Sequence, residues 1–344
     1  QTLSRSSPVN SSVWNMKTKF LATVIALVFV LAACSSETNK DIEITEVWIT
    51  LPDGIRLAAD VFWPAGADKS DRFPVLLEYL PYRKDESRAR NYSVYSYFLD
   101  HGYVVARVDM RGTGRSEGVT IPYEYSDIEL DDGEDVIDWL ANQEWSTGSI
   151  GMFGISWGGF NSIQMAMRNP PALKAFVSMM STEYLYQEDV HYMDGIMHTD
   201  SWMMSNDLYN ALPGAPDFTL DEEWVENRFN VEPSVYSYMR QQRDGPFWDR
   251  ASARDQYEKI KVPGYHIGGW YDGYRNSLPR MLEHVDAPTK ALIGSWDHDF
   301  PHNAWHEPRI EWRHEAVRWF DHWLKNEDTG ILEEPDFAVY VRDY

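Results

Sequence analysis

Short apolar runs bounded by turn residues recur along the chain from residue 43, and helical spacing separates most of them. Strands are predicted at 44–51, 55–63, 73–79, 103–109, 150–155, 173–180, 262–268 and 290–294. Helices are predicted at 92–100, 127–142, 158–168 and 309–325. Pro52-Asp53-Gly54 joins the first two strands as a hairpin turn. Strands that alternate with helices form parallel sheets, so we predict a mostly parallel sheet with helices on both faces.

One long segment breaks this alternation. Residues 183–258 are rich in Met, Tyr, Trp and Asp and contain no clear strand pattern. Connections of that length inside an α/β domain are usually inserted elements, often over an active site. We therefore expect the α/β domain in two parts, 43–182 and 259–330, with 183–258 as an inserted cap.

The first 34 residues have the pattern of an export signal. Met16–Lys19 is basic, residues 20–33 are apolar, and Leu31-Ala32-Ala33-Cys34 ends the segment. The apolar run is too short to span a bilayer and fits a signal-peptide core. The only cysteine of the chain stands after two small residues, which resembles the lipobox of bacterial lipoproteins. We expect Cys34 to carry a lipid, with 1–34 as leader and signal peptide and 35–42 as a linker; an ordinary signal peptide or a signal anchor is the alternative.

The charge and composition of the chain argue against several classes of binding partner and ligand. The 344 residues hold 31 basic and 54 acidic side chains, for a net charge of −23. Such a balance argues against nucleic acid as a partner, because phosphate binding needs a basic surface. A single cysteine leaves no internal disulfide and no cysteine-based zinc site. The aromatic share is 14%, with 15 tryptophans, which indicates an aromatic core or a cleft lined with rings.

The strongest chemical signal is Gly154–Gly158, which has the form G-x-S-x-G. It follows a predicted strand and opens a predicted helix, the context of a nucleophile elbow. Glycines are needed there because the turn leaves no room for Cβ atoms and the helix must approach the sheet closely. We therefore predict that Ser156 is a nucleophile.

A nucleophilic serine needs a base and an orienting acid, and on this kind of fold they follow in the order Ser, Asp, His. Asp272, in the loop after the strand at 262–268, is the candidate acid. His298, in the loop after the next strand, is the candidate base, with His302 and His306 as competitors. The four-residue steps between these histidines suit one helix face, but Pro301 disfavours a continuous helix, so we expect no catalytic metal.

These motifs together resemble the CocE/NonD family of α/β-hydrolases, which includes cocaine-esterase-like enzymes, glutaryl acylases and X-Pro dipeptidyl-peptidases. The resemblance rests on Asp131–Leu140, Trp145, Gly148, Ile150–Met152, Gly154–Gly159, Pro52–Gly54, Pro81–Lys84, Asp109–Gly114, Gly269–Asp272 and Trp296–His298, and it covers roughly 43–330. It implies an α/β-hydrolase fold with a helical cap, no cofactor, and a triad of Ser156, Asp272 and His298. It also implies an oxyanion hole formed by the Trp157 backbone N–H and the Tyr82 hydroxyl; the alternative for Tyr82 is a structural ring at a strand end.

Two departures from the family pattern stand out. Family members usually continue into a β-sandwich domain, and we expect 331–344 to be the start of such a domain, truncated here. Relatives that act on α-amino acid esters carry acidic residues shortly after the triad aspartate. Gly273-Tyr274-Arg275 occupies that place, so we do not expect that specificity.

The sequence therefore predicts a serine hydrolase that cleaves small ester, amide or peptide substrates and is anchored in a bacterial envelope through Cys34. Within the enzyme class the choice lies between an acyl esterase or acylase and an X-Pro dipeptidyl-peptidase. From another class, a non-catalytic lipoprotein that binds substrates in an aromatic cleft is the alternative. The sequence does not indicate an oligomeric state.

Overall fold

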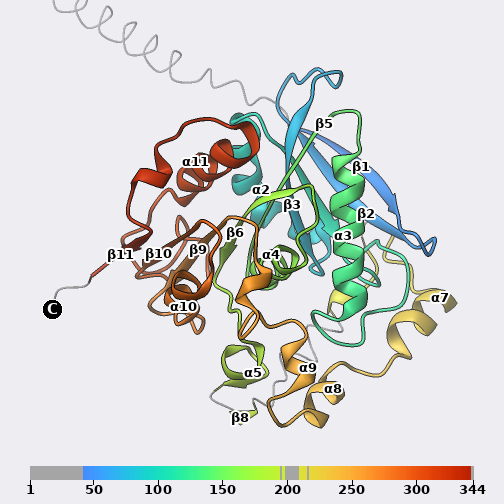
Figure 1. Cartoon of the computed structure of the whole chain (residues 1–344). Coiled ribbons are helices and arrows are strands. Elements are labelled where there is room, and N and C mark those ends of the chain that lie inside the picture. The colour runs from blue at the N-terminus through green and yellow to red at the C-terminus, as the bar shows by residue number, and fades with distance from the viewer. Residues whose placement is uncertain (1–41, 194–195, 198–208, 215–216, 342–344) are drawn as a thin grey trace, which may run out of the picture. The chain divides into compact units, whose positions relative to one another are not determined.

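The structure is a computed structural model that describes residues 42–193, 196–197, 209–214 and 217–341. Its centre is a nine-stranded sheet in the order β1-β2-β4-β3-β5-β6-β9-β10-β11. The strands are β1 (Glu43–Thr50), β2 (Arg56–Trp63), β3 (Phe73–Leu80), β4 (Val104–Asp109), β5 (Ser146–Ile155), β6 (Leu173–Met179), β9 (Gly264–Gly269), β10 (Thr289–Gly294) and β11 (Phe337–Val339). Figure 1 shows them fanning out as a twisted sheet.

The strand directions agree with the alternation in the sequence. β1 and β2 form the predicted antiparallel hairpin, and β2 is also antiparallel to β4. All other neighbours, from β4 through β3 to β11, are parallel. Parallel strands put their carboxyl ends at one edge of the sheet, which is where ligands bind in folds of this kind.

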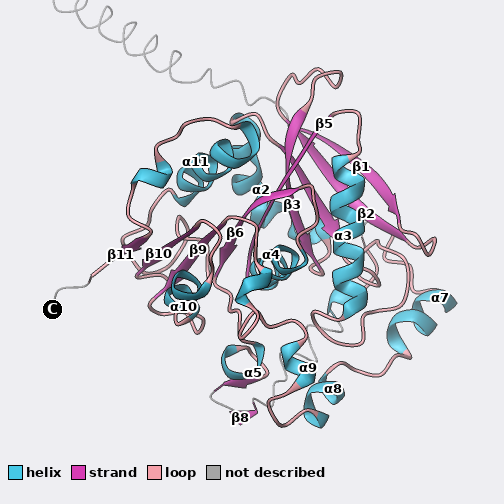
Figure 2. Ribbon diagram, viewed as in Figure 1, coloured by secondary structure: helices cyan, strands magenta, loops and turns pink. Residues whose placement is uncertain are grey.

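Helices cover both faces of the sheet, as predicted (Figure 2). One face carries α2 (Lys84–Asp100) and α11 (Trp312–Lys325), which contact each other. The other face carries α3 (Asp127–Ala141), α4 (Trp157–Arg168) and α10 (Ser277–His284). Strands β2 to β6 are almost wholly buried between these layers, so burial of their apolar side chains is the main source of stability.

The inserted segment is built from short elements in the part that the structure describes. They are α5 (Leu185–Glu188), β7 (Tyr192–Met193), β8 (Ile196–Met197), α7 (Glu222–Trp224), a π-helix (Val225–Phe229), α8 (Val235–Arg240), α9 (Pro246–Asp249) and a 3₁₀-helix (Tyr257–Lys259). β7 and β8 pair as a small hairpin outside the main sheet. Its regular elements are thus mostly short helices joined by longer loops, and its described residues contribute no strand to the nine-stranded sheet.

Buried ionic contacts fix the beginning of this segment to the α/β core. The Arg280 guanidinium on α10 donates to Glu183 through Nε (2.5 Å) and to Glu188 through Nη2 (2.6 Å). Ser277 Oγ donates to Glu183 (2.5 Å) and Asn276 Nδ2 to Glu188 (3.1 Å). Both carboxylates are buried, so their charges depend on these partners.

Three boundaries differ from the sequence predictions by three residues or more, and α10 lies where no helix was predicted. β5 begins at Ser146 rather than at 150. α2 begins at Lys84, eight residues before the predicted start at 92, and α11 begins at Trp312 rather than at 309. The segment in which we expected a separate β-domain to begin forms a 3₁₀-helix (Ile331–Glu333) and then β11, which pairs with β10 at the edge of the central sheet.

Candidate active site

Ser156 lies in a strained turn between β5 and α4. Its backbone has φ 57° and ψ −125°, a conformation that few side-chain-bearing residues adopt. The glycines around it have no space for side chains: a Cβ on Gly154 would lie 2.6 Å from the Gly158 backbone, and one on Gly159 would lie 2.7 Å from the Met179 carbonyl oxygen. This is the geometry of a nucleophile elbow, which holds the serine above the sheet at the start of a helix.

Asp272 and His298 are brought together at the same sheet edge. Asp272 follows β9, His298 follows β10, and the two strands are neighbours. The distance from His298 Nδ1 to Asp272 Oδ2 is 2.6 Å, and the other carboxylate oxygen accepts the Tyr274 backbone N–H at 2.8 Å. The Asp272 side chain is 2% exposed and that of His298 45%, so a buried carboxylate lies against a ring that solvent can reach.

The competing histidines have other partners. His302 Nδ1 accepts a hydrogen bond from Trp312 Nε1 (2.8 Å). His306 stacks on Tyr271, with ring centroids 4.0 Å apart. Of the three histidines in this loop, His298 is therefore the one that the structure places against Asp272.

Ser156, His298 and Tyr82 line one cavity of about 390 Å³ at the carboxyl ends of β3 and β5. Leu80 and Ile155 provide part of an apolar wall. Charged side chains line the cavity too, among them Glu78 and Arg107, which the sequence analysis did not select. Nothing in the sequence distinguishes Glu78 and Arg107 from other strand residues. Only the register of the sheet places them beside the candidate nucleophile.

The candidate oxyanion groups lie next to Ser156. The backbone N–H of Trp157 belongs to the first turn of α4, where helical N–H groups have no partner within the helix. Burial raises the pKa of the Tyr82 hydroxyl well above its usual range, against a hydrogen bond with Ser156 that lowers it, so Tyr82 stays a proton donor at neutral pH. The rings of Tyr82 and Trp157 pack edge to face, with their centroids 6.0 Å apart, and this contact holds Tyr82 against the elbow.

A buried carboxyl group holds the Trp157 side chain in place. Trp157 Nε1 donates to Glu129 Oε1 at 2.7 Å, and the Tyr125 backbone N–H donates to Glu129 Oε2 at 2.5 Å. Burial raises the pKa of Glu129 to about 8, because these hydrogen bonds only partly offset the loss of solvent.

A second group of polar residues is linked to the candidate triad through Tyr274, whose ring contacts His298. Glu124, Asp189 and His191 are all buried, and their ligand-type atoms lie within 4.8 Å of one another, close enough to surround a metal ion. His191 Nε2 lies 2.6 Å from Glu124 Oε2, and the Tyr274 hydroxyl donates to Asp189 Oδ1 at 3.3 Å. Burial raises the pKa of Asp189 to about 6. None of these residues could be selected from the sequence as a metal ligand, because they are separated in the chain and match no ligand spacing.

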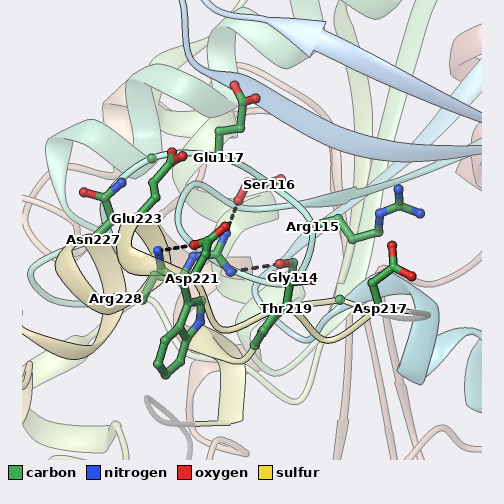
Figure 3. A pocket seen from close by; sticks show the side chains of 14 residues that line it. Gly114, Arg115, Ser116, Glu117, Asp217, Thr219, Asp221, Glu223, Asn227 and Arg228 are labelled. Atoms are coloured by element: carbon green, nitrogen blue, oxygen red, sulfur yellow. Dashed lines mark hydrogen bonds between the residues drawn. The ribbon is translucent and has the colours of Figure 1, made fainter.

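A further cavity, of about 220 Å³, lies between the loop after β4 and the inserted segment (Figure 3). There Arg228 Nη1 donates to the Gly114 carbonyl oxygen at 2.8 Å, and Nη2 donates to that of Ser116. Arg228 thus attaches the π-helix to the core, and Ser156, Asp272 and His298 do not line this cavity.

The predicted lipidation residue, Cys34, lies outside the described residues, as do the leader and nearly all of the linker. In the described part of the chain, none of the helices combines the length and the apolar character that crossing a membrane requires.

Comparison with known proteins agrees with this fold. The fold is that of the α/β-hydrolases: a CocE/NonD family hydrolase from Staphylococcus aureus superimposes with a TM-score of 0.69 at 23% identity, covering 88% of this chain and 54% of that one. The sequence matches the X-Pro dipeptidyl-peptidase (S15) family over residues 53–299, and the chain belongs to that family, which places it in the class of the serine hydrolases. The resemblance inferred from the motifs is therefore confirmed.

The cocaine esterase of Rhodococcus sp. is 26% identical over 286 residues, which cover 74% of this chain and 48% of that protein. The chain spans about half the length of the curated relatives it matches.

Proposed function

We propose that the protein is an acyl hydrolase that cleaves ester or amide bonds through Ser156, His298 and Asp272. The observation that carries this proposal is the placement of Ser156, Tyr82 and His298 around one cavity, with His298 held against a buried aspartate. The family membership supports it, because relatives in the comparison are named as esterases and as X-Pro dipeptidyl-peptidases.

In the proposed reaction, His298 takes the proton of the Ser156 hydroxyl as the oxygen attacks the substrate carbonyl carbon. The tetrahedral oxyanion accepts hydrogen bonds from the Trp157 N–H and the Tyr82 hydroxyl, which are already in place before the charge develops. His298 then gives the proton to the leaving group, and the acyl-enzyme forms. Water attacks that ester with His298 again as base, which releases the acid and restores Ser156. Asp272 holds the imidazole with Nδ1 protonated throughout.

The test is covalent labelling combined with turnover. A fluorophosphonate should label the wild type on Ser156, and Ser156→Ala should lose both labelling and hydrolysis while its circular dichroism spectrum stays unchanged. Ser93→Ala, which changes an exposed serine on α2, is the matched control and should keep both. Hydrolysis by Ser156→Ala within about tenfold of the wild-type rate would overturn the proposal, since loss of a triad member costs several orders of magnitude.

An acyl esterase or acylase is our first choice of activity, and an X-Pro dipeptidyl-peptidase is the second, because the matched family carries that name. A panel of acyl esters and X-Pro p-nitroanilides separates them. We expect kcat/KM to be highest on a member of the ester series; a preference for the anilides would reverse the order. If neither the panel nor the fluorophosphonate reacts, the protein is a non-catalytic binding protein.

We also propose that the protein is anchored in the bacterial envelope through a lipid on Cys34. The support is the sequence alone: a basic start, a short apolar run and a cysteine after two small residues. Cys34→Ser should move the protein from the membrane pellet to the soluble fraction, because no acyl chains remain to bind the bilayer. If Cys34→Ser still pellets with membranes and keeps its apolar leader, a signal anchor is the correct account.

A further inference from the structure

Three potential metal ligands meet where the beginning of the inserted segment contacts the α/β core. Glu124 lies in the loop before α3, and Asp189 and His191 lie between α5 and β7. Their ligand atoms lie within 4.8 Å of one another, and each residue is at most 4% exposed. An imidazole nitrogen together with carboxylate oxygens is a ligand set that Zn²⁺ takes in proteins. The residue types are therefore those of a transition-metal site.

One oxygen of this group has no hydrogen-bond partner. Asp189 Oδ1 accepts from the Val190 backbone N–H at 2.8 Å and from the Tyr274 hydroxyl at 3.3 Å. Within the described residues, Asp189 Oδ2 accepts no hydrogen bond. It lies 3.9 Å from His191 Nε2, which is too long for one. Because a buried charged group without a partner is costly, this oxygen indicates that a cation binds beside it.

A second acidic group in the same fold shows how such charge is otherwise balanced. Glu46, Asp60 and Asp85 also bring carboxylate oxygens within 4.8 Å of one another. There Lys84 Nζ donates to all three, at 3.0, 2.9 and 3.1 Å, so a lysine supplies the positive charge. Among the described residues, no lysine or arginine forms an ion pair with Asp189. A bound metal ion would do at Asp189 what the lysine does in the other group.

The spacing of the ligand atoms suits a small divalent ion. Ligand atoms around a tetrahedral Zn²⁺ lie about 3.3 Å apart. His191 Nε2 is 2.6 Å from Glu124 Oε2 and 3.9 Å from Asp189 Oδ2, so small side-chain rotations bring both distances to that value. The His191 ring stacks on Tyr238 with centroids 3.6 Å apart, and the Tyr238 hydroxyl accepts the Glu124 backbone N–H at 2.7 Å. Tyr238 thus holds two of the three ligand residues in place.

We propose that Glu124, Asp189 and His191 bind a Zn²⁺ ion, with water at the fourth coordination position. Binding displaces the proton between His191 Nε2 and Glu124 Oε2 to solvent, because the nitrogen must be unprotonated to bind the metal. The ion joins the beginning of the inserted segment to the loop before α3. It takes no part in the acyl-transfer steps, so the inference does not depend on the proposed function.

The experiment measures zinc binding directly. The untagged full chain is stripped with EDTA, dialysed, and titrated with Zn²⁺ against a chromophoric chelator of known affinity. We expect saturable binding of about one Zn²⁺ per chain, counted independently by elemental analysis. The melting temperature should rise by about 5 °C when free Zn²⁺ exceeds its Kd about a hundredfold, because only the folded state holds the three ligands together.

Asp189→Asn removes the anionic ligand and keeps the Oδ1 acceptor. It should weaken zinc binding by more than about 100-fold, since even groups that only support a ligand contribute 10- to 100-fold. Without metal it should melt no lower than the stripped wild type, because it removes a buried charge that lacks a partner. Where Asp189→Asn does not fold, His191→Gln removes the nitrogen ligand instead. Asp85→Asn, in the group that Lys84 neutralises, is the matched control and should keep the wild-type affinity.

Three results would overturn the inference. The first is the absence of saturable Zn²⁺ binding in the wild type. The second is wild-type affinity in the folded Asp189 or His191 variant, which would place the ion on other ligands, such as His302 and His306. The third is the same loss of affinity in Asp85→Asn, which would show an effect of net charge alone. Failure of the proposed function would appear instead as no labelling of Ser156 by a fluorophosphonate, with zinc binding unchanged.

Discussion

His298 Nδ1 lies 2.6 Å from Asp272 Oδ2, and the remainder of the Asp272 carboxylate is held by the backbone of its own loop. A histidine in this arrangement keeps its proton on Nδ1 and presents Nε2 as a base. The two residues come from the loops after adjacent strands, so sheet register rather than sequence distance determines their contact.

Asp272→Asn should therefore lower kcat by about four orders of magnitude, because the amide favours the wrong histidine tautomer. Turnover of the best ester at saturating substrate is the measurement. Asp297→Asn changes a neighbouring loop aspartate and should stay near the wild-type rate. If both substitutions have equally small effects, Asp272 does not orient the base.

Tyr82→Phe should lower kcat by about two to three orders of magnitude with little change in KM, since the hydroxyl would stabilise only the transition state. The ring and its contact with Trp157 remain, so the melting temperature should be unchanged. Tyr92→Phe, on the exposed side of α2, is the control. A loss below about fivefold would mean that Tyr82 is a structural ring and that another group supplies the second donor.

Gly159→Ala should destabilise the fold by about 1–3 kcal/mol, because α4 cannot take a methyl group so close to the end of β6. The added Cβ would lie 2.7 Å from the Met179 carbonyl oxygen, so backbone must move. Urea unfolding measures the change. At Gly273 a Cβ would meet only the Met193 side chain at 3.5 Å, so Gly273→Ala should cost much less. Equal effects at the two glycines would argue against a steric requirement at the elbow.

Acid should destabilise the protein partly through His266. Burial lowers the pKa of His266 to about 3, whereas a histidine in the unfolded chain has a pKa of about 6.5. Between these values the unfolded state binds a proton that the folded state does not, so stability falls as the pH drops from about 6.5 toward 3. His266→Phe keeps a ring against Phe176 and removes this titration.

The loss in unfolding free energy between pH 7 and pH 4.5 should be about 2 kcal/mol smaller in His266→Phe than in the wild type. His284→Gln changes an exposed histidine and should show the wild-type loss. The same acid sensitivity in His266→Phe and the wild type would assign the effect to other groups.

The elements with strong local patterns could be predicted from the sequence. The hairpin of β1 and β2, the parallel strands and the elbow at Ser156 all have residue types that specify them locally. The start of α2 was missed because Lys84–Arg90 has no apolar periodicity. The buried Lys84 at the start of α2 is stabilised by an ion pair with Asp60 on β2. The sequence of the helix does not reveal this partner.

The residues of the candidate site also fall into two groups, those with a local sequence signal and those brought together only by tertiary contacts. Ser156, Asp272 and His298 follow strands in a fixed order, so motif and order were enough to select them. Arg107 and Glu78 meet through the register of β4 with β3, and His191 meets Glu124 across 67 residues of chain. Contacts of this kind depend on tertiary packing, for which local spacing carries no signal.

The bonds from Arg280, Ser277 and Asn276 to Glu183 and Glu188 have a mechanical consequence. These three donors follow the loop that carries Asp272 by only a few residues. A hinge motion at the first turn of the inserted segment would therefore displace the loop that carries Asp272 and disturb the contact of Asp272 with His298. In the proposed reaction, the beginning of the inserted segment therefore has to keep its position for Asp272 to orient His298.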